Sequence, residues 1–211
     1  MLRYAITDRR QLGPDEGTRR AALLEQAARL AGAGVDFVQL REKDLSPGEL
    51  AALATEVAHV LRRQEGGGEA PPRLLVNGGI DVALAAYADG VHLTAGGDAP
   101  APGDVRRRYR EAGRQPPVVS LSCHRVADVA RARAGWESGE GPDLILFGPV
   151  FEKRVGERLI SEGVGLDVLG EACGAAGSIP VLALGGVARE DVAACLQTGA
   201  AGVAAIRMFL L

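Results

Sequence analysis

Short apolar runs alternate along the chain with longer segments in which apolar residues recur every three or four positions. The short runs are continuous, which is typical of parallel strands that are covered on both faces. The longer segments have the period of amphipathic helices, as in Leu23, Ala27 and Leu30. Eight strands are predicted in this way, at residues 3–7, 36–41, 74–77, 90–93, 118–121, 144–147, 181–184 and 202–206.

Eight strands with helices between them favour a closed parallel barrel, the (β/α)8 or TIM barrel, over a doubly wound open sheet. An open sheet of that kind usually has a glycine-rich turn after its first strand, but the chain reads Thr7-Asp8-Arg9 there. We expect residues 1–211 to form a single barrel domain, because 211 residues suit one core. Only residues 207–211 follow the last predicted strand, so the eighth helix should be short or absent.

Two further segments carry expectations of their own. The charged stretch at residues 152–163 follows the sixth predicted strand and is long enough to act as a mobile lid. The final residues Met208, Phe209, Leu210 and Leu211 are all apolar and need to be covered. We therefore expect a homo-oligomer, a dimer, in which a second subunit covers part of this tail.

The overall charge gives no reason to expect a nucleic acid or a membrane as a partner, because 27 Asp and Glu outnumber 24 Lys and Arg. No apolar run is long enough to span a bilayer, and no signal peptide precedes the first strand. Three cysteines without a paired spacing indicate neither a disulfide framework nor a zinc site. These features predict a cytoplasmic protein.

The strand predicted at residues 181–184 ends in Gly185 and Gly186. Glycines at the end of a buried strand leave backbone N–H groups uncovered, so that an anion can approach them closely. The last strands of many (β/α)8 barrels hold a phosphate group in this way. The pattern predicts an enzyme that acts on a small phosphorylated molecule.

Several segments, in order along nearly the whole chain, resemble the thiamine phosphate synthase/TenI superfamily of (β/α)8 barrels in thiamine biosynthesis. No single segment is specific, but the series is. The segments are Tyr4-Ala5-Ile6-Thr7-Asp8, Gln39-Leu40-Arg41-Glu42-Lys43, Val76-Asn77, Ala88-Asp89-Gly90-Val91-His92-Leu93, Ser120-Leu121-Ser122-Cys123-His124, Phe147-Gly148-Pro149-Val150-Phe151, Glu162-Gly163-Val164-Gly165-Leu166, Leu184-Gly185-Gly186-Val187 and Gly199-Ala200-Ala201-Gly202-Val203.

The resemblance implies one of two activities, because the family contains two kinds of enzyme with the same barrel. Thiamine phosphate synthase joins a pyrimidine pyrophosphate to a thiazole phosphate and expels pyrophosphate with Mg2+. The TenI-type thiazole tautomerase shifts a proton in a thiazole phosphate carboxylate. A third reading is a catalytically silent member that binds a thiazole or thiamine phosphate and acts as a regulator.

The resemblance also implies roles for particular residues. His124, directly after the fifth strand, would be the general acid/base of a tautomerase, since imidazole exchanges protons near neutral pH. Alternatively, His124 only forms a hydrogen bond with loop backbone, and we expect His92 to be structural. The remaining candidates are Gln39, Arg41, Lys43 and Asn77 for substrate binding, and Gly163, Gly185, Gly186 and Arg207 for phosphate binding.

Two of these groups have alternative explanations. Gln39, Arg41 and Lys43 alternate along a strand, which places all three on the face toward the pocket, or in a polar layer inside the barrel. Arg207 would offer phosphate a bidentate cationic fork, or it is a surface arginine near the terminus.

Departures from the synthase pattern favour the tautomerase. Gly78 stands where the synthase has a magnesium-binding Asp, and Asp98 lies one residue late for the second such Asp. The Thr-x-Thr-Lys lid motif is missing, and Lys153 and Arg154 are the lid's remaining cations. At most one carboxylate would hold a hard divalent cation weakly. The main hypothesis is therefore a TenI-type tautomerase without a cofactor, and the alternative is a synthase with Mg2+ at Asp98.

Overall fold

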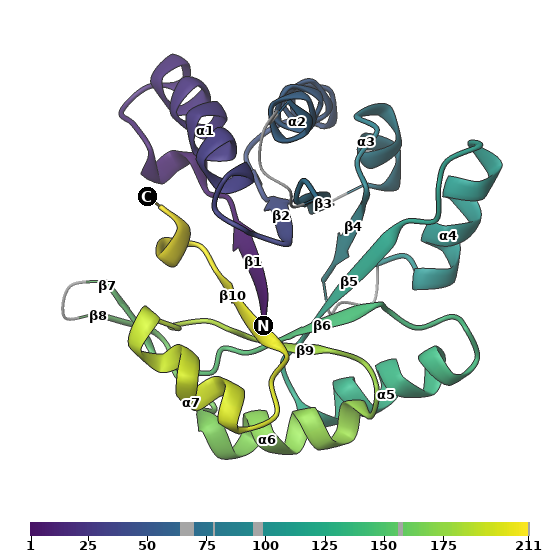
Figure 1. The fold of residues 1–211 in the computed structure, drawn as a ribbon, viewed down its shortest axis with the longest axis vertical. Helices are drawn as coiled ribbons and strands as arrows, with labels where there is room; N and C mark the ends of the chain where they lie inside the picture. The colour runs from purple at the N-terminus through teal and green to yellow at the C-terminus, as the bar shows by residue number, and fades with distance from the viewer. Residues whose placement is uncertain (64–69, 78, 95–98, 156–157, 211) are drawn as a thin grey trace.

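The computed structural model describes residues 1–63, 70–77, 79–94, 99–155 and 158–210, leaving aside the side chains of residues 153–155 and 158. Parallel strands form a closed barrel with helices around it (Figure 1), which confirms the predicted TIM barrel. β10 pairs with β1 to close the ring, and β6 lies between β5 and β9. The barrel strands are β1 (Leu2–Ile6), β2 (Phe37–Leu40), β3 (Arg73–Asn77), β4 (Gly90–Leu93), β5 (Val118–Cys123), β6 (Leu144–Phe147), β9 (Val181–Leu184) and β10 (Gly202–Ala205).

Helices follow the barrel strands and cover the outside of the ring. After β10 the described chain has only a 3-10 turn at Arg207–Phe209, as predicted for a short or absent eighth helix. None of the helices in the described ranges is long and apolar enough to cross a membrane. The helices are α1 (Glu16–Ala31), α2 (Pro47–Arg62), α3 (Ile80–Ala85), α4 (Pro102–Glu111), α5 (Val126–Glu137), α6 (Gly165–Ala176) and α7 (Val192–Gln197).

The connection between β6 and α6 differs from the expected loop. It contains an antiparallel hairpin of β7 (Lys153–Val155) and β8 (Arg158–Ser161), which stands apart from the barrel sheet (Figure 1). Leu159 and Ile160 on this hairpin are exposed. The hairpin escaped sequence analysis because its strands are short and rich in charge, without the alternation that marks a half-buried strand.

Apolar side chains fill the interior of the barrel, among them Tyr4, Leu75, Leu146 and Leu182. Neighbouring strands approach one another closely where glycine leaves room. A Cβ atom on Gly202 would lie 1.9 Å from the carbonyl oxygen of Leu2 on the adjacent strand. Packing of this kind compensates for the small number of aromatic residues, because short side chains still give a dense interior.

The described part of the apolar C-terminal tail, residues 208–210, is buried or partly buried by the chain itself. Phe209 is 2% exposed and belongs to the same core cluster as Leu23, Leu30 and Ala205. The side-chain amide of Gln26 on α1 donates a hydrogen bond to the carbonyl oxygen of Phe209 at 2.7 Å. The tail therefore gives less reason for a second subunit than the sequence indicated, and the homodimer stays a prediction.

A buried ion pair joins the loops that follow β1 and β2. Arg9 is 2% exposed, and its Nη1 lies 3.1 Å from Oε2 of Glu42, which is also buried. The backbone N–H of Arg9 donates to the same carboxylate, and the Thr7 hydroxyl donates to it at 2.6 Å. The Arg9 guanidinium continues outward to the half-exposed carboxylates of Glu16 and Asp44.

This network fixes the start of the β2–α2 loop at the upper rim of the barrel. The backbone N–H of Arg41 donates to the Thr7 hydroxyl at 3.0 Å, and the same hydroxyl donates to the carboxylate of Glu42, the next residue. These two bonds fix the backbone at Arg41. Burial raises the pKa of Glu42, while the hydrogen bonds from Thr7 and Arg9 oppose that rise. The hydrogen bonds from Thr7 and Arg9 therefore stabilise the ionised form of the buried Glu42 carboxylate.

Arg9→Met should destabilise the protein by about 3–5 kcal/mol near neutral pH, because it leaves the Glu42 carboxylate buried without its cation. Without Arg9 the pKa of Glu42 rises further. The penalty is thus present above that pKa and shrinks as pH falls through it, when Glu42 takes up a proton. Urea unfolding at neutral pH and near pH 5 measures both effects.

Arg10→Met is the matched control, since Arg10 is exposed and, in the part of the chain that the structure describes, forms its ion pair with Asp8 alone. It should change the unfolding free energy by less than about 0.5 kcal/mol. Equal losses for the two variants, or a loss for Arg9→Met that does not change with pH, would contradict this account of the pair.

Candidate functional site

A cavity of about 420 Å³ opens where β9 and β10 end, at the carboxyl-terminal rim of the barrel. Gly185 and Gly186 line it from β9, and Arg207 lines it from the turn after β10. These are three of the residues that sequence analysis put forward for phosphate. The rim is the usual place for a phosphate site in this fold.

The two glycines are required by the local backbone. Gly185 and Gly186 have φ of 90° and 70°, a left-handed region that favours glycine. A Cβ on Gly185 would lie 2.7 Å from Cα of Pro149, and one on Gly186 would lie 2.7 Å from Cβ of Phe151. The turn after β9 therefore presses directly against the segment that follows β6.

Gly163 packs against the same segment after the hairpin. A Cβ on Gly163 would lie 2.5 Å from the carbonyl carbon of Phe151, the residue that also meets Gly186. Gly163 thus comes close to Gly186, although it does not line the rim cavity. Within the described ranges, no hydrogen bond uses the amide N–H of Gly163, Gly186 or Arg207, so these three donors are available.

Two arginines supply positive charge to the rim cavity. Arg189 and Arg207 both line it and are exposed, and neither has a carboxylate within 4.0 Å among the described residues. Glu152 lines the cavity as well. Sequence analysis missed Arg189, whose only signal was its position three residues after Gly186.

A polar cluster inside the barrel centres on His92, which is 5% exposed. Its Nδ1 lies 2.8 Å from the Ser120 hydroxyl and its Nε2 lies 2.9 Å from the Ser122 hydroxyl, while Tyr4 OH lies 3.0 Å from Ser120. Burial, aided by the charge of Arg41, lowers the pKa of His92 to about 3. His92 is therefore neutral near pH 7 and has both ring nitrogens occupied, which fits the structural role expected for it.

The four candidate substrate residues lie at different heights in the barrel. Gln39 is buried within it, and its side-chain Nε2 has no acceptor among the described residues. Asn77 pairs in register with His92 on the neighbouring strand. The strand ends at Leu40, so the alternation proposed for Arg41 and Lys43 does not continue.

The end of β2 corrects the expectation for Lys43. The side chain that turns inward is that of Glu42, which meets Arg9. Lys43, which was expected to face the pocket, lies exposed in the following turn. Arg41 is half-buried and close enough to His92 for its charge to lower that pKa. Arg41 and Asn77 thus both lie near His92, whereas Gln39 lies buried within the barrel.

His124 lies directly after β5, and its Nδ1 is 2.6 Å from the carbonyl oxygen of Gly148 after β6. Because a carbonyl only accepts, Nδ1 carries the proton, and in neutral His124 the Nε2 keeps its lone pair. Gly148 in turn packs on β9, since a Cβ there would lie 1.9 Å from the carbonyl oxygen of Leu184. His124 and Gly185 are therefore on the same rim, on either side of the end of β6.

The two do not share a cavity, however. His124 lines a separate groove of about 670 Å³, together with Pro102 of α4 and Asp128 of α5. His124 and the glycine pair thus lie on one rim but line different cavities.

Several sequence candidates lie outside what the structure describes. Asp98 and Gly78 fall in the ranges left out, and the side chains of Lys153 and Arg154 are not described. In the remaining residues there is no group of three or more His, Cys, Asp or Glu side chains that could hold a metal ion. The described part of the site therefore does not fit a carboxylate-held magnesium.

Comparison with known proteins identifies the family. The family of thiamine monophosphate synthase, TMP-TENI, matches residues 3–209. A Geobacter sulfurreducens protein, provisionally named a thiamine-phosphate synthase, is 42% identical over 203 residues, which are 96% of this chain and 84% of that protein. The thiamine-phosphate synthase of Methanoculleus marisnigri is 36% identical over 195 residues, 91% of this chain and 82% of its own.

A solved structure agrees with the fold. The thiamine phosphate pyrophosphorylase from Pyrococcus furiosus superposes with a TM-score of 0.71 at 24% identity, covering 97% of this chain and 85% of that one. The family match extends over both ends of the barrel and includes the rim glycines. The chain belongs to the TMP-TENI family of thiamine biosynthesis.

Proposed function

We propose that this chain is a thiamine-phosphate synthase, which joins a pyrimidine pyrophosphate to a thiazole phosphate and releases pyrophosphate. Relatives that carry this name and align with more than nine tenths of the chain support the synthase over the tautomerase favoured by the sequence departures. The observation that carries the proposal is the rim cavity, where the Gly186 amide and Arg207 suit the phosphate of the thiazole substrate.

Charge at the rim supports the same proposal. Both substrates are phosphorylated, and the leaving pyrophosphate has to be stabilised as it departs. Cations that have no carboxylate partner in the described structure are fully available to phosphate oxygens. In this proposal Gln39, Arg41 and Asn77 hold the pyrimidine pyrophosphate, and Gly163, Gly185, Gly186 and Arg207 hold the thiazole phosphate, with Lys153 and Arg154 on the lid.

The family's activity implies Mg2+, but the described residues offer no side-chain cluster that fits it. Asp98, the one carboxylate put forward for it, lies outside the described ranges. We therefore assign no step to a metal. The functions derived for this chain's own residues are binding of the phosphates, their orientation at the mouth, and neutralisation of charge.

A second candidate is the thiazole tautomerase, which a specific observation favours. The hydrogen bond from His124 Nδ1 to Gly148 leaves Nε2, which has no partner among the described residues, to take and return a proton. Gly78, in place of the magnesium-binding Asp of the synthase pattern, also favours the tautomerase. A catalytically silent, thiazole-binding regulator is the third candidate.

Pyrophosphate release separates the three candidates. With both substrates and Mg2+ present, the synthase should release pyrophosphate, and release should stop when either substrate is omitted or a chelator is added. An absorbance change of the immature thiazole alone, unaffected by the chelator and without pyrophosphate release, would contradict the synthase and favour the tautomerase. Binding of thiazole phosphate without any turnover would leave the silent regulator.

Substitution of His124 gives an independent test of the reaction type. In a synthase, His124→Gln should change kcat by less than about threefold, because no step of the proposed reaction needs its proton. In a tautomerase the same substitution should lower kcat by about 10²- to 10⁴-fold. His59→Gln on the exposed face of α2 is the control and should leave either activity unchanged.

Arg207→Ala should raise the KM for thiazole phosphate by about 10- to 100-fold, the loss expected for a hydrogen bond to a charged group. The KM for the pyrimidine substrate should change little. Steady-state kinetics with each substrate varied in turn measures both. Arg29→Ala, at an exposed position of α1, is the control, and an unchanged thiazole KM in Arg207→Ala would remove Arg207 from the phosphate site.

A further inference from the structure

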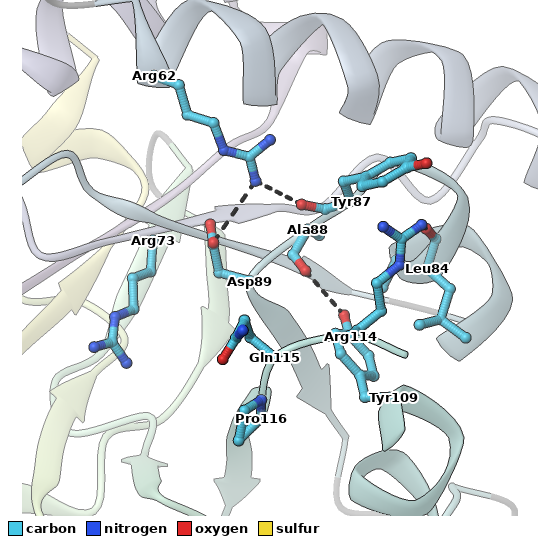
Figure 2. Close-up of a pocket in the computed structure, with 11 residues that line it drawn as sticks. Arg62, Arg73, Leu84, Tyr87, Ala88, Asp89, Tyr109, Arg114, Gln115 and Pro116 are labelled. Atoms are coloured by element: carbon cyan, nitrogen blue, oxygen red, sulfur yellow. Dashed lines mark hydrogen bonds and ion pairs between the residues drawn. The ribbon is translucent and has the colours of Figure 1, made fainter. Parts of the chain in front are cut away.

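A second cavity, of about 450 Å³, lies at the opposite end of the barrel from the rim site. Its lining comes from the end of α2 at Arg62, the start of β3 at Arg73, residues 83, 84 and 87–89 before β4, Tyr109 of α4, and residues 114–116 before β5 (Figure 2). All of these strand ends are amino-terminal ends. The cavity is therefore separate from the candidate active site.

Positive charge dominates this cavity. Three arginines line it, at positions 62, 73 and 114, against the single carboxylate of Asp89. The lining thus has an excess of two positive charges in a protein whose net charge is -3. Figure 2 shows Arg73 and Arg114 on either side of the view, with Asp89 and Gln115 between them.

The Asp89 carboxylate already has partners for both of its oxygens. One of its oxygens accepts a hydrogen bond from the backbone N–H of Leu74 at 2.8 Å, and the other lies 3.6 Å from Nη2 of Arg62. Arg73 and Arg114 have no carboxylate within 4.0 Å in the described part of the chain. Other arginines of the described chain, such as Arg20, Arg106 and Arg108, do have such partners.

Arg114 also has an unused donor. Its Nε is buried and has no hydrogen-bond acceptor among the described residues. Its guanidinium lies over the ring of Tyr87, with Cζ 3.4 Å from the ring centroid, which holds the group in place. A buried donor without an acceptor is costly, and an oxyanion in the cavity would satisfy it.

Tyr87 shows that the backbone here is held in an uncommon conformation. Its φ is 53°, in the left-handed region, and its carbonyl oxygen accepts a hydrogen bond from Nη2 of Arg62 at 2.5 Å. Its side chain is 59% exposed. This conformation ends α3, because the N–H of Ala88 donates to the carbonyl of Ala83 and that of Tyr87 donates to the carbonyl of Leu84, and it leaves the Tyr87 ring beside Arg114.

We propose that this cavity binds a small phosphate-type oxyanion among the guanidinium groups of Arg62, Arg73 and Arg114. Arginine forks are well suited to phosphate, and the two guanidinium groups that have no carboxylate partner among the described residues match the charge of a phosphate dianion. Inorganic phosphate, pyrophosphate and a phosphate monoester share this chemistry. The proposal does not rest on the reaction at the rim, because it concerns residues at the other end of the barrel.

Isothermal titration of the full chain with inorganic phosphate, pyrophosphate and glycerol phosphate in turn tests the proposal. Arg73→Ala and Arg114→Gln should each weaken binding of the preferred probe by at least about tenfold. Arg110→Ala is the matched control, an exposed arginine one turn before Arg114 that does not line the cavity, and it should leave binding unchanged. Which probe binds most tightly distinguishes a free anion from a monoester.

Arg207→Ala separates this cavity from the rim. Binding that is lost in Arg207→Ala but intact in Arg73→Ala and Arg114→Gln would place the anion at the rim and overturn the proposal. No binding at millimolar probe, or equal weakening by Arg110→Ala, would overturn it as well. Arg73 is exposed, so Arg73→Ala keeps the test valid if Arg114→Gln proves to lower the melting temperature through lost packing on Tyr87.

Discussion

The close approach of the backbone after β9 to the backbone after β6 is the constraint on which the site depends. The amide of Val150 donates to the carbonyl of Leu184 at 2.8 Å, and the amide of Phe151 donates to that of Gly185 at 3.0 Å. Side chains at Gly148 or Gly185 would collide with the facing backbone. The contact therefore needs glycine, and it fixes the floor of the rim cavity.

The same contact orders the rest of the rim. Gly148 receives the hydrogen bond from His124 on one side and packs on Leu184 on the other, so β5, β6 and β9 end in one connected layer. Across the mouth, the buried pair of Arg9 and Glu42 holds the loop that carries Arg41. Hydrogen-bonded backbone on one side and a buried ion pair on the other thus hold in place the two groups of residues that we propose to bind the phosphates.

Much of the fold could be predicted from sequence, because continuous apolar runs and amphipathic periods depend on local chemistry. The run ending in Gly185 and Gly186 predicted a strand followed by a phosphate site, and the structure has the strand and a cavity at its end. The sequence could not show that Glu42, between two candidate residues, turns inward, because its partner Arg9 lies 33 positions away. It could not show Arg189, Arg114 or Tyr87 either, since their significance depends on partners that the barrel brings together. The hairpin of β7 and β8 lacks the apolar alternation that would have marked it.

The most direct test of the central claim is the response of individual backbone amides to thiazole phosphate, followed by nuclear magnetic resonance on the labelled 21.9 kDa chain. If the phosphate lies on the free donors between the ends of β9 and β10, the amide signals of Gly186 and Arg207 should show the largest shifts, with Gly163 next. Shifts concentrated around Arg73 and Arg114, or around the groove beside α5, with Gly186 unmoved, would contradict the account.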